Sequence, residues 1–365
     1  MKLTVEREKL LAPLQAVIGV VERRQTMPIL ANVLLAVHEG KLSITATDLE
    51  VELVAATEVS VQHPGDITVP GRKFLDILRS LPADVSVAIS TDGDKISIRA
   101  GRSRFSLSTL PASDFPIIED IHAQQKVKVP RAELKRLLDK THFSMAQQDV
   151  RYYLNGTLME VDGKSLRAVA TDGHRLAICE AELASKAGPA LQVIVPRKGV
   201  LELQRILDQE GDAEVSIGTN HIRAMIGDVR FTSKLIDGKF PEYNRVIPAS
   251  PAHAVRADRD QLRAALQRTA ILSNEKYRGI RISMRPNLLL VKAHNPEQEE
   301  AEEEIEVSYG GVELEVGFNV NYLLDALSAI DGAEVEVGVT DSNSSCLIRS
   351  PGSSAVRYVV MPMRL

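Results

Sequence analysis

Apolar residues recur along this chain with two spacings that predict two kinds of secondary structure. Between the helices, apolar and polar residues alternate, as in VSVAIS (85–90) and KISIRA (95–100) on either side of an Asp92-Gly93 turn signal. Helices mixed with antiparallel strands in this order predict an α+β fold with helices on one face of the sheets. Spacings of three and four residues predict amphipathic helices over 7–16, 72–81, 131–140, 197–208, 259–268 and 319–330.

The same order of elements occurs three times, because the sequence repeats itself. The line GKLSITATDLE (40–50) returns as GKSLRAVATDGH (163–174), and more faintly as NLLLVKAHNPE (287–297). The offset is nearly constant, at 124 residues from Asp48 to Asp172 and 125 from Phe115 to Phe240. One offset held at separate landmarks indicates a triplicated unit. We expect three domains at residues 1–122, 126–248 and 252–365, with linkers within 120–125 and 247–253.

Composition excludes several classes of protein. The start of the chain is charged throughout, and no window approaches the roughly 18 apolar residues of a membrane span. Two isolated cysteines, Cys179 and Cys346, suit a reducing cytosol, so we expect a cytoplasmic protein. The sequence has no phosphate-binding loop, dinucleotide-binding fingerprint or nucleophile elbow. We expect no cofactor and no metal site.

The charges are segregated along the chain. The net charge is −5, yet the six helix windows together carry +7, which leaves −12 for the remainder. The basic residues of these helices, among them Arg136, Lys140 and Arg205, lie opposite the apolar stripes. Two interpretations remain open: a solvated helix face, or a concave surface of helices that contacts phosphates without reading sequence.

An acidic and a basic segment lie far apart in the sequence. The run NPEQEEAEEEIEV (295–307) is rich in Glu and predicts an edge strand or its approach, or a merely solvated face. The segment IRAGRSRFSL (98–107) predicts a basic strand. Opposite charges at the two ends of a chain favour head-to-tail association, which closes a ring if the geometry allows.

The stretch VATDGHRLAIC (169–179) brings Asp172, His174 and Arg175 close together, as in a hydrolase active site. The first repeat keeps the aspartate, Asp48, but has neither the histidine nor the arginine. The shared aspartate is therefore interpreted as a structural residue that bonds nearby backbone at a strand-to-turn exit. The hydrolase hypothesis ranks lowest, and we expect no catalytic residue.

The three tandem units, with TATDLE (45–50), VATDGHRLA (169–177), FPEYNRVIP (240–248) and the terminal YVVMPMRL (358–365), resemble the bacterial DNA polymerase III β subunit family, the replication sliding clamps. The resemblance covers residues 1 to 365. It implies three clamp domains with sheets outside and two helices each inside, associated head to tail as a ring-shaped dimer. Duplex DNA passes through such a ring, which tethers the polymerase and catalyses nothing.

The resemblance also implies three sets of site residues. The dimer contact involves Lys73, Ile77, Arg102, Arg104, Phe105 and Leu107 of the first domain, facing Ile271, Leu272, Glu297, Glu299, Glu300, Glu302 and Glu303 of the third. The DNA-facing residues are Arg24, Arg72, Gln148, Tyr152, Tyr153, Arg197 and Lys198. A hydrophobic peptide pocket between the second and third domains involves Leu154, Thr171, Gly173, His174, Arg175, Leu176, Pro241, Arg245, Val246, Asn319, Tyr322, Ser345, Val359, Val360, Met361, Pro362, Met363, Arg364 and Leu365.

The implied partners are a second copy of the chain, duplex DNA of any sequence, the polymerase III catalytic subunit and other polymerases. The clamp loader complex, and repair and ligation proteins that carry docking motifs, complete the set. The last helix departs from the basic pattern because Asp325 is its only charged residue, so we do not expect it to touch phosphate. A scaffold that docks peptides without binding DNA is the alternative.

Overall fold

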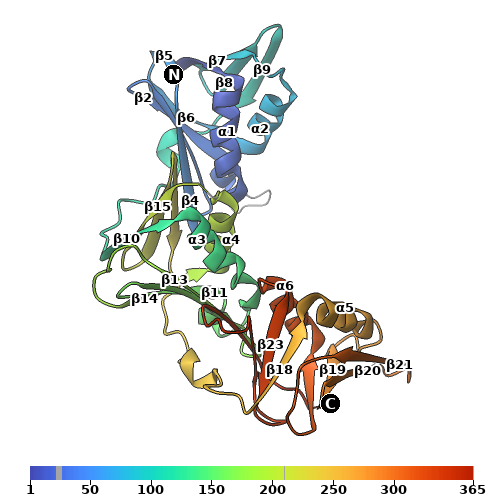
Figure 1. The fold of residues 1–365 in the computed structure, drawn as a ribbon. Helices are drawn as coiled ribbons and strands as arrows, with labels where there is room; N and C mark the ends of the chain where they lie inside the picture. Colours follow the sequence, from blue (N-terminus) through green and yellow to red (C-terminus); the bar gives the residue numbers. More distant parts are fainter. Residues whose placement is uncertain (22–26, 209, 365) are drawn as a thin grey trace. The chain divides into compact units, whose positions relative to one another are not determined.

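The computed structural model describes residues 1–21, 27–208 and 210–364. The described chain forms two compact units, Met1–Leu134 with Lys198–Leu235, and Lys135–Arg197 with Ile236–Leu365 (Figure 1). The division falls inside the second repeat, so each unit combines elements of two repeats. Strand pairing between neighbouring repeats explains this division, as the sheet orders below show.

The first repeat follows the predicted order of elements. The expectation of one strand over 98–107 is wrong, because Gly101 has a φ of +57° and turns the chain between two paired strands. The elements are β1 (Lys2–Glu6), α1 (Arg7–Val17), η1 (Ile18–Val20), η2 (Pro28–Ala31), β2 (Asn32–His38), β3 (Lys41–Thr47), β4 (Val51–Glu58), β5 (Ser60–His63), β6 (Gly65–Pro70), α2 (Gly71–Ser80), β7 (Ser86–Asp92), β8 (Lys95–Ala100), β9 (Ser103–Ser108) and η3 (Ala112–Asp114).

The second repeat places its elements in the same order. Its helices α3 and α4 begin at the residues that the apolar spacing predicts. The elements are β10 (Gln125–Pro130), α3 (Arg131–Asp139), η4 (His142–Ser144), η5 (Tyr152–Leu154), β11 (Gly156–Asp162), β12 (Ser165–Thr171), β13 (Arg175–Glu182), β14 (Leu191–Pro196), α4 (Arg197–Ile206), β15 (Asp212–Ile217), β16 (His221–Ile226), β17 (Val229–Lys234) and η6 (Tyr243–Val246).

The third repeat also contains two helices among its strands. Each helix has a side-chain N-cap: Asp258 accepts a hydrogen bond from the Gln261 amide, and Asn319 accepts one from the Asn321 amide. The elements are β18 (His253–Asp258), α5 (Arg259–Ala270), β19 (Gly279–Arg285), β20 (Leu288–His294), β21 (Glu300–Glu306), β22 (Leu314–Asn319), α6 (Val320–Ala329), β23 (Glu334–Val339), β24 (Cys346–Arg349) and β25 (Val356–Val360).

Among the described residues, the strands form four sheets, of which two cross from one repeat to the next. The orders are β5-β1-β7-β8-β9, β10-β15-β16-β17-β4-β3-β2-β6, β14-β11-β12-β13-β25-β24-β23-β18 and β21-β20-β19-β22. The β4–β17 pairing joins the first and second repeats and is called the first seam. The β13–β25 pairing joins the second and third repeats and is called the second seam. Both seams are antiparallel, which confirms the α+β fold with antiparallel sheets.

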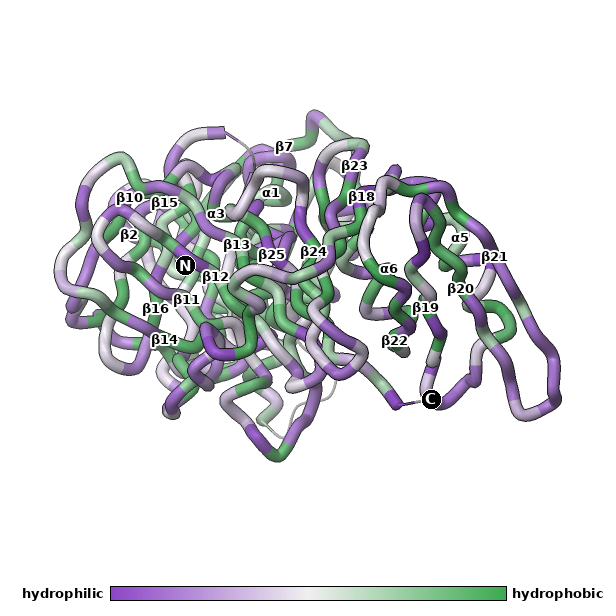
Figure 2. The backbone as a smooth tube through the Cα atoms, turned by 60° about the horizontal axis from the view of Figure 1, so that its bottom comes forward, coloured by the Kyte–Doolittle hydropathy of each residue, from purple (hydrophilic) through white to green (hydrophobic). Residues whose placement is uncertain are grey.

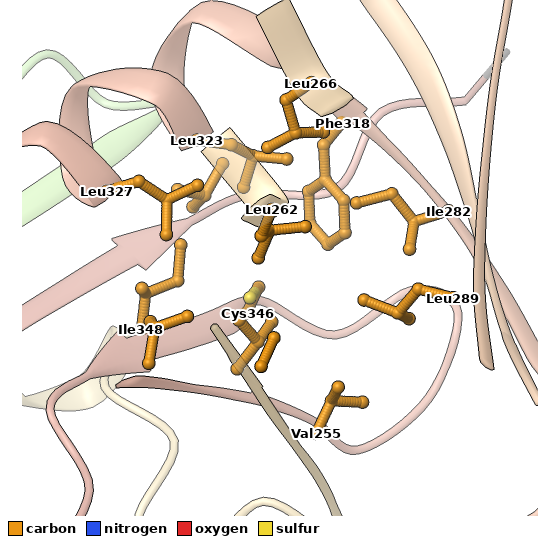
Figure 3. Packing of buried hydrophobic residues seen from close by; sticks show 14 of the residues in the cluster. Val255, Leu262, Leu266, Ile282, Leu289, Phe318, Leu323, Leu327, Cys346 and Ile348 are labelled. Atoms are coloured by element: carbon orange, nitrogen blue, oxygen red, sulfur yellow. The ribbon is translucent and has the colours of Figure 1, made fainter. Parts of the chain in front are cut away.

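The core of the third repeat lies between its two helices and the sheets around them. Leu262 of α5, Leu323 of α6 and Phe318 of β22 point toward one another in Figure 3, and all three are buried. Figure 2 shows the corresponding hydropathy along the backbone, with green in helices and strands and purple mostly at the connecting turns. Burial of these apolar side chains is the main favourable contribution to folding, at about 25 cal/mol per Å².

Candidate functional site

An apolar cavity of about 220 Å³ opens beside the second seam. Strands β12, β13 and β25 contribute to it, together with η5 and the segment that contains η6. Leu154, Leu176 and Val359 are buried apolar residues of its lining, whereas Val246 and Met361 are 42% and 40% exposed. The complete lining is Arg151, Tyr153, Leu154, Thr171, Gly173, Arg175, Leu176, Pro241, Glu242, Tyr243, Val246, Val359 and Met361.

The turn between β12 and β13 shapes one side of the cavity. The Asp172 carboxylate oxygen Oδ1 accepts hydrogen bonds from the backbone amides of His174 (2.9 Å) and Arg175 (3.0 Å). The Thr171 hydroxyl donates to the Arg175 carbonyl at 2.6 Å and accepts from the Gly173 amide at 3.1 Å. Asp48 makes the corresponding bonds in the first repeat, to the amides of Glu50 (3.0 Å) and Val51 (2.7 Å).

These bonds contradict the hydrolase hypothesis. The Asp172 carboxylate and the Thr171 hydroxyl are both used to fix the turn, so neither is placed as a base or a nucleophile. His174 takes part through its backbone, since its carbonyl accepts a hydrogen bond from the Met361 amide at 2.9 Å. This last bond extends the second seam to the edge of the cavity.

Arg175 connects the second repeat to the third. Its Nη1 contacts Asp325 Oδ2 of α6 at 2.5 Å, and its Nη2 donates to the Phe143 carbonyl at 2.7 Å. The guanidinium also lies over the Tyr322 ring, 4.5 Å from the ring centroid. Burial raises the pKa of the Tyr322 hydroxyl, so this phenol stays neutral. Asp325, the only charged residue of α6, is thus engaged by Arg175.

The rim of the cavity is polar. Arg151 bonds Asp149 through Nη2 (2.8 Å) and Nε (3.0 Å), and these bonds lower the pKa of the Asp149 carboxyl to about 2. The same Nη2 contacts the Asp172 carbonyl at 3.3 Å. A β-carbon on Gly173 would lie 2.9 Å from Arg151 Nη1, and Gly173 has a φ of +89°, so glycine fits this turn best.

The structure brings together part of the predicted pocket set. Leu154, Thr171, Gly173, Arg175, Leu176, Pro241, Val246, Val359 and Met361 line the cavity. Tyr322 and Ser345 adjoin it, because Tyr322 packs under Arg175 and the Ser345 hydroxyl bonds the Val246 carbonyl at 3.2 Å. Arg151, Glu242 and Tyr243 line the cavity but were not predicted, and Tyr153 was assigned to DNA instead.

The other predicted pocket residues are not part of the cavity lining. Val360 is buried in the core of the third repeat, and Arg245 is an exposed partner of Glu242 at 2.5 Å. Asn319 caps α6, and His174 and Pro362 lie on the chain beside the lining residues. Met363 and Arg364 line a separate cavity of about 360 Å³ with Tyr277 and His294. Leu365 lies outside the described residues.

The basic helix residues were expected on a free surface, and several are engaged within the protein instead. Lys140 Nζ donates to the Ala329 carbonyl and to Asp331 Oδ1, both at 2.6 Å. Arg136 Nη2 donates to the Glu180 carbonyl at 2.8 Å, and Arg205 Nη2 to the Ala16 carbonyl at 2.5 Å. Lys140 and Arg205 thus join neighbouring repeats, and Arg136 joins α3 to β13 within the second repeat, which helical spacing alone could not reveal.

Of the predicted DNA-facing residues, Lys198 is paired with Asp48, and Arg197 is half-buried. Arg72 is exposed, with its Nη2 on the Val21 carbonyl at 2.6 Å. Gln148 is an exposed residue with a φ of +54°, and Tyr152 is 57% exposed. Arg24 lies outside the described residues.

The residues assigned to a dimer contact lie largely on strand edges. In the first repeat, β9 ends its sheet and carries exposed Arg104 with half-buried Phe105 and Leu107, and Arg102 occupies the preceding turn. Lys73 and Ile77 lie on α2. In the third repeat, β21 ends its sheet and carries Glu300, Glu302 and Glu303, after Glu297 and Glu299. Ile271, beside Leu272 at the end of α5, is 75% exposed.

Metal-binding clusters and membrane-spanning helices are both absent from the described part of the chain. Within it, no group of three or more His, Cys, Asp or Glu is placed to hold a metal ion. In the same residues, no helix has the length and apolar character needed to cross a membrane.

Comparisons with known proteins place the whole chain in one family. Residues 1–119, 128–242 and 244–364 match the N-terminal, central and C-terminal domains of the DNA polymerase III beta subunit. The chain is 55% identical to the beta sliding clamps of Pseudomonas aeruginosa and Salmonella typhimurium, with full coverage of both sequences in each case. A crystal structure of the P. aeruginosa sliding clamp bound to griselimycin is 55% identical, with a TM-score of 0.97 and full coverage of both chains.

Proposed function

We propose that this chain, which belongs to the DNA polymerase III beta subunit family, works as a closed head-to-tail homodimer around duplex DNA. It is a beta sliding clamp, a processivity factor without catalytic activity. The finer parts of this function are the ring, the passage of DNA and the docking of partner peptides. The last of these has the most direct support, which is the apolar cavity at the second seam.

The ring is supported by two complementary edge strands. Strand β9 presents basic side chains, and β21 presents a row of glutamates; both end their sheets and so offer unpaired backbone groups. Pairing of β9 of one protomer with β21 of the other satisfies these groups and sets Arg102 and Arg104 against Glu300 and Glu302. Phe105 and Leu107 then bury apolar surface. Because each protomer has one edge of each kind, the contact is heterologous and can close a ring, and the proposed ring contains two copies.

A double charge reversal tests this contact. Arg102→Glu with Arg104→Glu should convert the dimer to a monomer in analytical ultracentrifugation at micromolar concentration, because like charges then face each other across the edge. The matched control is Arg256→Glu, which changes a partner of Glu336 on β18, outside β9 and β21. Restoration of the dimer by mixing the first variant with Glu300→Arg/Glu302→Arg would support the pairing, and a dimer that survives the double reversal would contradict it.

DNA binding of a weak and sequence-independent kind follows from the charges. Exposed Arg72 and the tyrosine and glutamine side chains of the 148–153 segment can contact phosphates, whereas pairing with Asp48 lowers the net positive charge around Lys198. A closed ring needs no tight contact, because it is linked to DNA topologically. The clamp should remain on nicked circular DNA after loading and slide off once that DNA is linearised. Equal retention on both forms, or on neither, would contradict encirclement.

The cavity at the second seam suits a short peptide with apolar side chains. Buried Leu154, Leu176 and Val359 provide apolar contact, and Met361 adds an adaptable side chain at the opening. We infer that docking motifs of the polymerase III catalytic subunit, other polymerases, the clamp loader, and repair and ligation proteins bind here. Griselimycin, bound by the P. aeruginosa relative, is a convenient competitor for such a peptide. Displacement of a labelled motif peptide by griselimycin is expected, and simultaneous binding of both would contradict a single site.

The proposed place of action is the cytoplasm, where bacterial DNA is replicated. The two cysteines, Cys179 and Cys346, are buried and form no disulfide, which suits the reducing conditions there.

A further inference from the structure

A row of polar residues crosses four neighbouring strands beside the cavity. Directly opposed pairs link the row, from Gln192 on β14 through Glu160 on β11 and Arg167 on β12 to Glu180 on β13. Side chains two residues apart on a strand share a face of the sheet. The row therefore lies on the same face as the apolar cluster of the second seam, since its neighbours at that spacing, Ile194, Leu158, Val169 and Ile178, belong to this cluster.

Arg167 is the centre of the row. Its Nη1 donates to Glu160 Oε1, and its Nε and Nη2 donate to Glu180 Oε2 at 3.3 and 3.2 Å. The outer oxygens are also bonded, because Gln192 donates to Glu160 Oε2 and the Ser165 hydroxyl donates to Glu180 Oε1 at 2.7 Å. The guanidinium is thus held in a fixed position between two carboxylates.

Tyr243 connects this row to the cavity. Its ring belongs to the cavity lining and is 5% exposed. Its hydroxyl accepts a hydrogen bond from Arg167 Nη1 at 2.9 Å and donates one to Glu160 Oε1 at 3.2 Å. The ring therefore packs on the apolar part of the sheet face, while the hydroxyl reaches the polar row.

The cavity wall around Tyr243 has little regular structure of its own. The wall segment, residues 241–246, contains the single 3-10 turn η6 and contributes Pro241, Glu242 and Val246 to the lining. Phe240 and Ile247, at its two ends, pack on the apolar cluster of the second seam. Between these ends, the position of the wall depends on side-chain contacts such as those of Tyr243.

We infer that the Glu160–Arg167–Glu180 row positions one wall of the docking pocket through the Tyr243 hydroxyl. This inference rests on the proposed docking function. Tyr243 and Arg167 are positioning residues: Arg167 is absent from the cavity lining, and the Tyr243 hydroxyl bonds the row. By holding the wall segment in place, the row prepares the pocket for the peptide and removes an ordering cost from binding.

The test measures affinity of the full-length dimer for a fluorescein-labelled synthetic peptide with the docking motif of a polymerase III catalytic subunit. Tyr243→Phe keeps the ring and removes the hydroxyl, so we expect affinity to fall about 5-fold, mainly through faster dissociation. Arg167→Met removes the centre of the row and should weaken binding about 20-fold. Arg167→Lys keeps one charge without the fork and should restore part of the loss.

A second polar row in the same sheet provides a matched control. Arg349 on β24 stands opposite Glu336 on β23 and bonds it at 2.7 and 2.9 Å, while Arg256 on β18 bonds the other oxygen at 3.3 Å. Arg349→Met therefore cuts a similar row whose hydrogen bonds, within the described part of the chain, do not reach the wall segment. It should lower thermal stability about as much as Arg167→Met and leave peptide affinity within 2-fold of the wild type.

Combined variants separate positioning from general destabilisation. Tyr243→Phe with Arg167→Met should bind no more weakly than Arg167→Met alone, because both changes release the wall segment by disrupting the contact between the polar row and the Tyr243 hydroxyl. Tyr243→Phe with Arg349→Met should show only the loss of Tyr243→Phe. Wild-type affinity in Tyr243→Phe, or losses that multiply in the first pair, would overturn the inference while leaving docking intact. A wild-type chain that does not bind the peptide would overturn the proposed function and this inference with it.

Discussion

The two seams are built alike and differ in chemistry. Backbone bonds establish their correspondence: the Lys234 amide donates to the Glu50 carbonyl at 2.8 Å, as the Met361 amide does to the His174 carbonyl at 2.9 Å. By strand register, Glu52 and Thr232 face each other at the first seam, where Leu176 and Val359 face each other at the second. Three equivalent positions are thus occupied by Glu52, Thr232 and Lys234 at the first seam, and by Leu176, Val359 and Met361 at the second.

The exchanged residues explain why the second seam holds an apolar cavity. At the first seam, the Glu52 side chain is fully buried and its Oε2 accepts a hydrogen bond from the Ile118 amide at 2.7 Å. This bond holds the segment after Phe115 against the sheet. At the second seam, Leu176 offers no acceptor, and the corresponding segment after Phe240 is held farther along by Tyr243. A repeated backbone therefore gives a closed joint in one place and an open apolar cavity in the other.

The largest expected effect comes from placing a glutamate at position 176, the position in the second seam that corresponds to Glu52 in the first. Leu176→Glu buries a carboxylate without the amide partner that Glu52 has, so we expect a loss of about 3–5 kcal/mol in the free energy of unfolding. Peptide affinity should fall at least about 100-fold. The control, Leu176→Met, nearly conserves volume and should keep binding within a few-fold. Anisotropy titration and urea unfolding measure both, and near-normal peptide binding by Leu176→Glu would refute the comparison.

A smaller effect is expected at the cavity opening. Met361 is 40% exposed, so Met361→Lys should fold normally, yet it places a charge where the first seam has Lys234. We expect peptide affinity to fall about 10-fold through lost apolar contact and desolvation of the ammonium group. The reciprocal change, Lys234→Met, is the control and should leave peptide stoichiometry at one per chain in calorimetry. A second peptide site in this control would show that one residue, rather than three, separates the seams.

Both seams have an aspartate that fixes a turn, Asp48 in the first and Asp172 in the second, and its substitution should lower stability equally in both. Asp48→Ala and Asp172→Ala each remove two backbone amide bonds at equivalent turns. Each change should cost about 1–2 kcal/mol in the free energy of unfolding. Urea denaturation followed by circular dichroism measures this cost. A neutral result for Asp48→Ala with a large loss for Asp172→Ala would mean that the aspartate of the second repeat does more than fix its turn.

The smallest expected effect is the pH dependence of the first seam. Burial raises the pKa of Glu52 above its ordinary value of 4.5, against the opposing influence of Arg230 and Arg223. The folded state then holds this proton more tightly than the unfolded chain does, and the stability gained below pH 4.5 is lost as pH rises through the folded-state pKa. Glu52→Gln remains neutral, so its melting temperature relative to that of the wild type should rise as pH increases from 4.5 through the folded-state pKa of Glu52, and should level off above it. A wild type that gains stability relative to Glu52→Gln over this range would contradict the assignment.

Much of the fold was predictable because local patterns set it. The helix starts follow the spacing of apolar residues, and the Asp48 and Asp172 turns follow from a motif that the repeats share. The 98–107 hairpin was missed because Gly101 was not recognised as a turn residue.

The site was only partly predictable because its decisive contacts join distant parts of the chain. The Tyr243 hydroxyl meets Arg167 across 76 positions, and Lys140 meets Asp331 across 191. Helical spacing marked Lys140 as polar-facing but could not show whether that face meets solvent or another repeat. Leu176 and Glu52 were aligned by the repeat, and this difference between otherwise equivalent positions was a signal for the pocket in the sequence itself.

The most direct measurement is a crystal structure of the full-length chain with a docking-motif peptide of the polymerase III catalytic subunit. We predict one peptide per chain at the second seam, with its apolar side chains against Leu154, Leu176 and Val359 and with Tyr243 still bonded to Arg167. Peptide bound at the first seam, or bound elsewhere with the second-seam cavity empty, would contradict the assignment of the docking site.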